Sequence, residues 1–211
     1  WGAAVEGSSR DVTSFLLMGR PQRGQPVVAQ VMVAVDSADP DTVIGHLNPF
    51  AQLAPLLDQS VRIAPYGSII VPPFGPHRGE GEPVARSSLV EHMTRDVALA
   101  AERVIVGGAS YFFQIRAVGG AVSDVDPAAT AYAHRSANFS VTAMGASRAR
   151  IDPVWDQLHR HALGLYLSFE TDPRPERLLD TFPPATLARL RALKSAVDPT
   201  GLFRDNFPLF P

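Results

Sequence analysis

Two segments in which side chain character alternates constrain the fold of this 211-residue chain more than any other feature. Residues 110–118 and 137–145 repeat with a period of two, which predicts β-strands. One predicted face is apolar and consists of Tyr111, Phe113, Ile115, Phe139, Val141 and Ala143. The other is mostly polar and almost uncharged, and consists of Phe112, Gln114, Arg116, Asn138, Ser140 and Thr142. A sheet with one apolar face is typical of antiparallel sheets that helices cover on one side.

The remaining segments predict further strands and several helices. Further strands are predicted at 11–18, 27–35, 61–71 and 165–169, and a loop at 72–86. Helices are predicted from Asp39-Pro40 to Pro49, from a Ser88–Glu91 capping box to Gly107, from Asp152-Pro153, and over 184–197. Strands with interspersed single helices and no regular βαβ alternation predict an α+β fold, with a mostly antiparallel sheet and helices packed on one face.

Composition excludes several classes of protein. The net charge is −2, with 19 basic and 21 acidic residues, so no basic surface for nucleic acid is expected. There is no cysteine, which excludes disulfides, thiolate metal sites and cysteine nucleophiles. No apolar run approaches the length that spans a bilayer. His159 and His161 would point about 200° apart on a helix, so no metal site is expected. We expect a cytoplasmic protein without membrane or nucleic-acid partners.

The polar face of the predicted sheet has two interpretations. Neutral polar groups cost less to desolvate than charges, so this face suits the wall of a semi-enclosed pocket. The alternative is an antiparallel face that simply lies against water.

Two motifs resemble the FAD-linked oxidases related to berberine bridge enzyme. The first lies within 119–141 and is carried by Gly119, Gly120, Ala121, Thr130, Ala131, Tyr132, His134 and Arg135. The second closes the chain and is carried by Lys194, Asp198, Pro199, Leu202, Phe203, Arg204 and Asn206. Both occur in the order and at the spacing of that family, so the resemblance covers nearly the whole chain.

The resemblance implies that residues 1–163 are the substrate-binding domain of such an oxidase. Residues 164–211 are then its C-terminal berberine-bridge segment, packed into the same globular unit. The FAD-binding domain is absent from this sequence, so the chain is expected to be inactive without it. The whole protein is expected to use FAD and to oxidise a small organic substrate by hydride transfer to the flavin. The alternative is a non-catalytic small-molecule-binding or interaction domain derived from the same fold.

The resemblance also implies roles for individual residues. Tyr166 aligns with a tyrosine beside the flavin and is the candidate catalytic base, with a packed tyrosine as the alternative. Asn206 and Phe203 are expected to contact the cofactor, with packing in the core as the alternative for Phe203. The substrate-binding candidates, which combine the resemblance with the polar sheet face, are Gln114, Arg116, Tyr132, His134, Arg135 and Ser168. His134 and Arg135 have an alternative as a hydrogen-bonded pair that fixes the long loop, and Arg116 has one as a cross-strand partner of Glu170. The alternative for Tyr132 is a packed aromatic residue.

Overall fold

The computed structural model describes residues 1–19, 24–69, 84–204 and 207–209. The chain divides into two compact units. One comprises Trp1–Thr13 and Val33–Glu82, and the other comprises Ser14–Met32 and Pro83–Pro211. The first contains helices α1 (Gly2–Glu6) and α2 (Pro40–Ala51) and a short 3-10 helix, η1 (Tyr66–Ile69). Most of the sheet and all of the candidate functional residues belong to the second.

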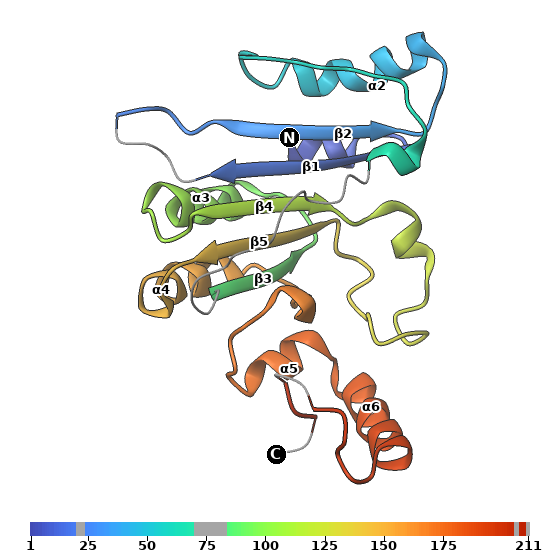
Figure 1. Ribbon diagram of the computed structural model, residues 1–211, viewed down its shortest axis with the longest axis vertical. Coiled ribbons are helices and arrows are strands. Elements are labelled where there is room, and N and C mark those ends of the chain that lie inside the picture. The colour runs from blue at the N-terminus through green and yellow to red at the C-terminus, as the bar shows by residue number, and fades with distance from the viewer. Residues whose placement is uncertain (20–23, 70–83, 205–206, 210–211) are drawn as a thin grey trace. The chain divides into compact units, whose positions relative to one another are not determined.

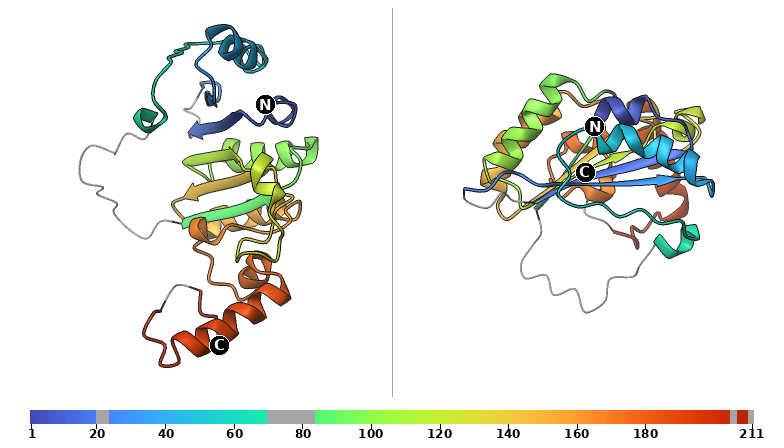
Figure 2. Two further views of the ribbon diagram at one scale, coloured as in Figure 1. Left: turned by 90° about the vertical axis from the view of Figure 1, so that its right-hand side faces the viewer. Right: turned by 90° about the horizontal axis from the view of Figure 1, so that it is seen from above.

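The α+β prediction is confirmed by a five-stranded antiparallel sheet with the order β2-β1-β4-β5-β3. Its strands are β1 (Val12–Gly19), β2 (Ala29–Val35), β3 (Val84–Val90), β4 (Phe112–Ala117) and β5 (Phe139–Gly145). Helices α3 (Arg95–Val106) and α4 (Arg148–His159) lie together on one face of β3, β4 and β5 (Figures 1 and 2). The later elements are η2 (Gly120–Asp124), η3 (Leu167–Phe169), α5 (Glu176–Thr181) and α6 (Pro184–Val197).

The strand register confirms the predicted division of side chains between the two faces. β4 and β5 pair with Phe113 opposite Ala143 and Ile115 opposite Val141, so these four side chains share one face. All four are buried, together with Trp155 and Leu158 of α4 and Val97, Ala101 and Val104 of α3. The helix-covered face therefore holds the core. Gln114, Arg116, Ser140 and Thr142 lie on the opposite face, which we call the polar sheet face.

The predicted loop over 72–86 and the predicted capping box at Ser88 are wrong where the structure describes them. Residues 84–90 form β3, which is buried along its whole length, and residues 72–83 lie outside the described residues. The true N-cap of α3 is Thr94, whose Oγ1 accepts a hydrogen bond from the Val97 amide at 3.3 Å. The fold buries Arg86, Ser87 and Ser88 and gives each of them a hydrogen-bond partner. In the sequence alone, three consecutive polar residues are hard to distinguish from a loop.

The predicted strand at 165–169 is also wrong. Residues 163–171 run along the free edge of β3 but make only one regular bridge, between Leu89 and Gly164. Further along, the Ser87 amide donates to a side chain oxygen, Glu170 Oε2, at 3.1 Å, and the Thr171 amide donates to the Ala85 carbonyl at 3.1 Å. At this point the Glu170 carboxylate, and not a main-chain carbonyl, accepts the hydrogen bond from β3. The main chain of the segment therefore need not keep strand geometry, and it forms η3.

Three further boundaries differ from the predictions. Residues 61–65 form no strand, and η1 follows Pro65, whose carbonyl accepts from the Ser68 amide at 2.9 Å; residues 70 and 71 lie outside the described part. Pro49 lies within α2 rather than ending it, although Asp39 caps that helix as predicted. α4 begins four residues before Asp152. Asp152 is therefore not a helix cap, and its half-buried carboxylate forms an ion pair with the buried Arg86.

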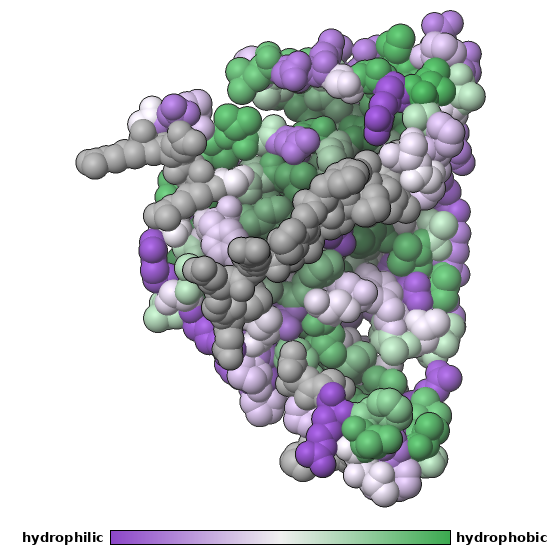
Figure 3. Space-filling model, viewed as in Figure 1, coloured by the Kyte–Doolittle hydropathy of each residue, from purple (hydrophilic) through white to green (hydrophobic). Residues whose placement is uncertain are grey.

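α6 spans the predicted residues, but its predicted apolar stripe is buried at only one end. Leu187 is buried, whereas Leu193 is 51% exposed and Val197 is 80% exposed. Leu202 and Phe203, in the segment after α6, are each 75% exposed. Hydrophobic residues are visible at the surface in this part of the chain (Figure 3). None of the helices in the described ranges is both long enough and apolar enough to cross a membrane.

A buried guanidinium joins the sheet to the helical layer. Arg86 of β3 is fully buried, and its Nη2 donates to Asp152 Oδ1 of α4 at 2.6 Å. Its Nη1 donates to Glu170 Oε1 at 3.3 Å and to the Ala85 carbonyl at 2.7 Å. Burial raises the pKa of Glu170, opposed by hydrogen bonds from backbone amides and by the charge of Arg86. The ionised carboxylate therefore depends on these partners.

Replacing Arg86 tests this cluster. Arg86→Met leaves Glu170 buried without its cation, so we expect the free energy of unfolding to fall by about 3–5 kcal/mol in chemical denaturation. Arg62→Met, in an exposed segment, is the control and should change it by less than about 0.5 kcal/mol. The double variant Arg86→Met/Glu170→Gln should recover part of the loss. A loss below about 1 kcal/mol for Arg86→Met would contradict the account.

Candidate functional site

Arg116 of β4 is held in place on the polar sheet face by neighbours on both sides. Its Nε donates to Gln114 Oε1, two residues away on the same strand, at 2.9 Å. Its guanidinium carbon lies 5.7 Å from the centroid of the Phe15 ring and 4.6 Å from that of Phe169. These distances are typical of cation–π contacts. Two predicted substrate-binding residues, Gln114 and Arg116, are therefore in direct contact.

Three aromatic rings continue from Arg116, and we call Phe169, Tyr166 and Tyr132 the aromatic row. The Phe169 and Tyr166 centroids are 5.5 Å apart, and those of Tyr166 and Tyr132 are 6.2 Å apart, both edge-to-face. At the far end the guanidinium carbon of Arg135 lies 5.0 Å from the Tyr132 centroid. Burial raises the pKa of Tyr132, opposed by the nearby charge of Arg135. The structure thus brings together Gln114, Arg116, Tyr166, Tyr132 and Arg135.

The position of Tyr166 follows from the edge of β3. Its amide donates to Ser87 Oγ at 3.1 Å, and this contact fixes the main chain just before η3. The side chain itself is 39% exposed. Tyr166 is therefore anchored by its backbone and accessible at its ring, as a residue that meets a ligand must be.

The predicted alternative partner of Arg116, Glu170, is engaged elsewhere. Both Glu170 carboxylate oxygens accept hydrogen bonds, from Arg86 and from three backbone amides. Within the described ranges, Arg116 forms no ion pair, and its Nη1 and Nη2 have no hydrogen-bond acceptor. Its two terminal nitrogens are thus open to a further acceptor.

Two more polar atoms near the aromatic row have no partner among the residues that the structure describes. Ser140 Oγ is buried and unbonded, and Ser140 pairs with Arg116 across β4 and β5, so both side chains lie on the polar sheet face. Arg135 Nε is likewise buried and unbonded, although its Nη2 donates to Thr130 Oγ1 at 2.6 Å. Buried polar atoms normally find a partner, so these atoms mark a place where a ligand or water can supply one.

His134 has a different environment from the other predicted site residues. Its Nε2 lies 2.8 Å from the Asp180 carbonyl and 3.0 Å from the Thr181 carbonyl, so this nitrogen carries the proton and donates to them. A Cβ on Gly164 would lie 2.3 Å from the His134 ring and from the Asp180 carbonyl oxygen. These contacts match the alternative interpretation of His134, in which it fixes the long loop.

The remaining predicted residues lie outside the aromatic row. Ser168 is exposed in η3. Phe203 is 75% exposed, and its carbonyl accepts a hydrogen bond from Lys194 Nζ. Asn206 lies outside the described residues. Their predicted contacts with substrate and cofactor remain predictions.

The close packing at Gly164 generates a second prediction. Gly164→Ala should lower the free energy of unfolding by roughly 1–3 kcal/mol, because the new methyl group displaces the His134 ring or the Asp180 carbonyl. Gly19→Ala is the control, since no atom of the described residues lies within 4 Å of a Cβ at that position, and the change should stay within about 0.5 kcal/mol. Equal stability of the two variants would contradict the packing described here.

A serine–histidine–aspartate chain, which the sequence analysis missed, lies under the helical layer. Ser88 Oγ is 2.8 Å from His159 Nδ1, and His159 Nε2 is 3.2 Å from Asp180 Oδ2. Ser88 is fully buried, so its hydroxyl cannot reach a substrate. These three hydrogen-bonded side chains link β3, α4 and α5, and they are not a nucleophilic triad.

The hydrogen-bonded series Ser88–His159–Asp180 predicts that the free energy of unfolding depends on pH. Burial and the charge of Arg177 lower the pKa of His159 below 6.5, although Asp180 and Asp156 oppose them. As the pH falls, the unfolded chain protonates His159 at a higher pH than the folded chain does. The contribution of neutral His159 to the free energy of unfolding is therefore fully present above pH 6.5 and is lost as the pH falls through the folded-state pKa. His159→Gln should reduce the decline in the free energy of unfolding between about pH 7 and about pH 5.5. His161→Gln, an exposed neighbour, should leave the decline unchanged.

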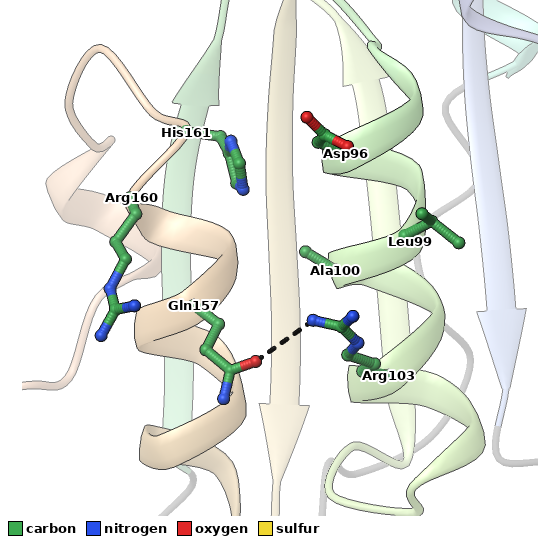
Figure 4. A pocket seen from close by; sticks show the side chains of 7 residues that line it. All are labelled: Asp96, Leu99, Ala100, Arg103, Gln157, Arg160 and His161. Atoms are coloured by element: carbon green, nitrogen blue, oxygen red, sulfur yellow. Dashed lines mark hydrogen bonds between the residues drawn. The ribbon is translucent and has the colours of Figure 1, made fainter.

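A shallow groove of about 360 Å³ lies between α3 and α4, away from the aromatic row (Figure 4). Its lining residues are Asp96, Leu99, Ala100, Arg103, Gln157, Arg160 and His161. Arg103 Nη1 donates across it to Gln157 Oε1 at 3.4 Å. None of the predicted site residues lines it. The aromatic row, which contains predicted site residues, is therefore a stronger candidate for the functional site than this groove.

Solved structures share this architecture. BBE-like 1 from Physcomitrella patens superposes with a TM-score of 0.75 at 15% identity over 99% of this chain and 49% of its own. The chain has a BBE-like fold. 6-Hydroxy-D-nicotine oxidase from Arthrobacter nicotinovorans gives a TM-score of 0.75 at 18% identity over 98% of this chain and 49% of its own. CrmK, a flavoenzyme involved in shunt product recycling in caerulomycin biosynthesis, gives 0.72 at 19% identity over 99% and 50%.

The BBE-like fold covers the chain almost completely, but the chain spans about half the length of these structures. No family model matches the sequence, and no curated protein matches it either. The named structures include an oxidase and a flavoenzyme, and at this identity they show the fold of the chain and not its activity. The boundary between a substrate domain and a C-terminal segment at residue 163 stays a prediction.

Proposed function

We propose that this chain is the substrate-binding part of an FAD-dependent oxidoreductase that oxidises a small organic molecule by hydride transfer. The observation that carries the proposal is the aromatic row with Arg116 beside the polar sheet face, within a BBE-like fold. α3 and α4 both lie on the other face (Figure 2). Gln114, Ser140 and Thr142 are buried. Their burial favours a pocket wall over a face that simply lies against water.

The residues present fit a flat, polar cofactor at this face. The Ser140 Oγ and the Arg116 terminal nitrogens, which have no partner among the described residues, and the aromatic row face a substrate, and a flat ring can close over that substrate from the side opposite the sheet. Asn206 and Phe203 are proposed to add contacts from the C-terminal segment. FAD, when bound, supplies the two-electron acceptor for the hydride. Most of its binding groups are proposed to come from an FAD domain of the same protein, because the chain spans about half of the structures it resembles.

Tyr166 is the proposed catalytic base. As a hydride leaves a carbon that bears a hydroxyl group, the hydroxyl proton must go to an acceptor, and the Tyr166 oxygen is the proposed acceptor. The backbone anchor at Ser87 and the two neighbouring rings restrict where that oxygen can lie. Gln114, Arg116, Tyr132 and Arg135 are proposed to orient the substrate, with His134 and Ser168 at the margin of the site.

The alternative function is a small-molecule-binding module without redox chemistry. The same aromatic row can hold a ring without any flavin, so the site geometry alone permits it. Purification of the whole protein that contains this chain separates the two functions. Visible flavin absorbance that survives gel filtration supports the oxidoreductase. A colourless protein that fails to take up added FAD would leave only the binding module.

Replacing the proposed base tests the role of Tyr166 in the whole flavin-loaded protein. Tyr166→Phe keeps the ring contacts but removes the oxygen, so turnover should fall by about a hundredfold or more while KM changes little. Tyr132→Phe is the matched control on the neighbouring ring, and its turnover should fall far less. Equal effects of the two variants, or full turnover in Tyr166→Phe, would rule out Tyr166 as the base.

A further inference from the structure

Among the described residues, Arg116 and Arg135 differ from the other buried or half-buried arginines of this unit, because neither has a carboxylate partner. Arg86, Arg174 and Arg177 each have carboxylate partners. Arg116 instead has two aromatic rings, one glutamine oxygen and, among the described residues, no carboxylate. A partly buried guanidinium loses hydration without gaining an ion pair, which costs free energy unless another anion completes the site.

The contacts of Arg116 fix its position and leave its hydrogen-bonding edge free. Gln114 takes Nε, and Phe15 and Phe169 contact the guanidinium, whereas Nη1 and Nη2 carry four N–H groups without an acceptor in the part of the chain that the structure describes. A guanidinium that packs on aromatic rings keeps its in-plane N–H groups for a planar acceptor such as a carboxylate. Little side chain entropy is then lost when the acceptor arrives.

The neighbours of Arg116 complete a site for a planar organic acid. Ser140, directly opposite on β5, has a buried hydroxyl with no partner in the described residues. Phe169 contacts both Arg116 and Tyr166, so an acid held at Arg116 would have its carbon skeleton beside the aromatic row. Arg135, at the far end of the row, forms no ion pair in the described ranges and adds a second positive charge.

We infer that the substrate is an organic acid whose carboxylate binds Arg116 Nη1 and Nη2 and whose ring or unsaturated skeleton lies against Tyr166 and Tyr132. This inference rests on the proposed function, since it names the substrate class of the same site. Arg116 is then a specificity-determining residue that selects anionic over neutral molecules. The proposed base, one ring away, acts on the part of the molecule remote from the carboxylate.

A matched pair of ligands tests the inference in the whole protein. Phenylacetate and phenylacetamide have the same shape and differ in charge, and calorimetric titration gives a Kd for each without any turnover. The wild type should bind phenylacetate at least about tenfold more tightly, because a charge-assisted bidentate contact is lost with the amide. The preference should weaken as salt is added.

Variants of the arginines assign the preference to a side chain. Arg116→Met should reduce it to within about twofold, and Arg116→Lys should keep part of it. Arg148→Met, exposed at the start of α4 on the other face of the sheet, should leave it unchanged. Arg135→Met should weaken the binding of the acid less than Arg116→Met does. No preference in the wild type, no binding of either ligand, or a full preference in Arg116→Met would each overturn the inference.

The flavin content of the same preparations separates this inference from the proposed function. A yellow protein without acid preference keeps the oxidoreductase and refutes the carboxylate site. A colourless protein whose acid preference depends on Arg116 keeps the carboxylate site and refutes the oxidoreductase.

Discussion

The buried ion pair between Arg86 and Glu170 is the interaction on which the rest of the described site depends. Glu170 binds Arg86 through Oε1 and the Ser87 amide through Oε2, so one side chain fastens the 163–171 segment to the edge of β3. Ser87 then holds the Tyr166 amide. The aromatic row is therefore positioned by a charge pair that lies behind it. The same pair also keeps Glu170 away from Arg116, which leaves that guanidinium open.

The two faces of the sheet have different roles: one holds the core, and the other carries the candidate binding groups. The helix-covered face holds Phe113, Ile115, Val141 and Trp155, and it also contains the His159 chain and the Arg86 cluster. The polar sheet face carries groups that are positioned but not fully bonded, such as Ser140 Oγ and the terminal nitrogens of Arg116. An unsatisfied buried polar atom destabilises a fold, so Ser140 Oγ and Arg135 Nε are evidence for a ligand near the aromatic row. Trp155 Nε1, which also has no partner among the described residues, lies in the core and carries no such implication.

Sequence reasoning succeeded where side chain pattern alone determines structure and failed where partners distant in sequence do so. The alternation in β4 and β5 predicted both faces, and the apolar stripe predicted α3, because periodicity is a local signal. β3 was missed because Arg86, Ser87 and Ser88 read as loop residues until Asp152, Glu170 and His159 are placed beside them. For the site, the structure places Gln114, Arg116, Tyr132, Arg135 and Tyr166 together, and their roles stay predictions. The rings Phe15 and Phe169, which confine Arg116, could not be derived from spacing.

The most direct test of the central claim is a crystal structure of the whole protein with FAD added. The account predicts that the isoalloxazine ring lies against the sheet face that carries Arg116 and Ser140, with Tyr166 in contact with the space between ring and sheet. A protein without bound flavin, or a flavin on another surface while other parts of the chain fill this face, would contradict it.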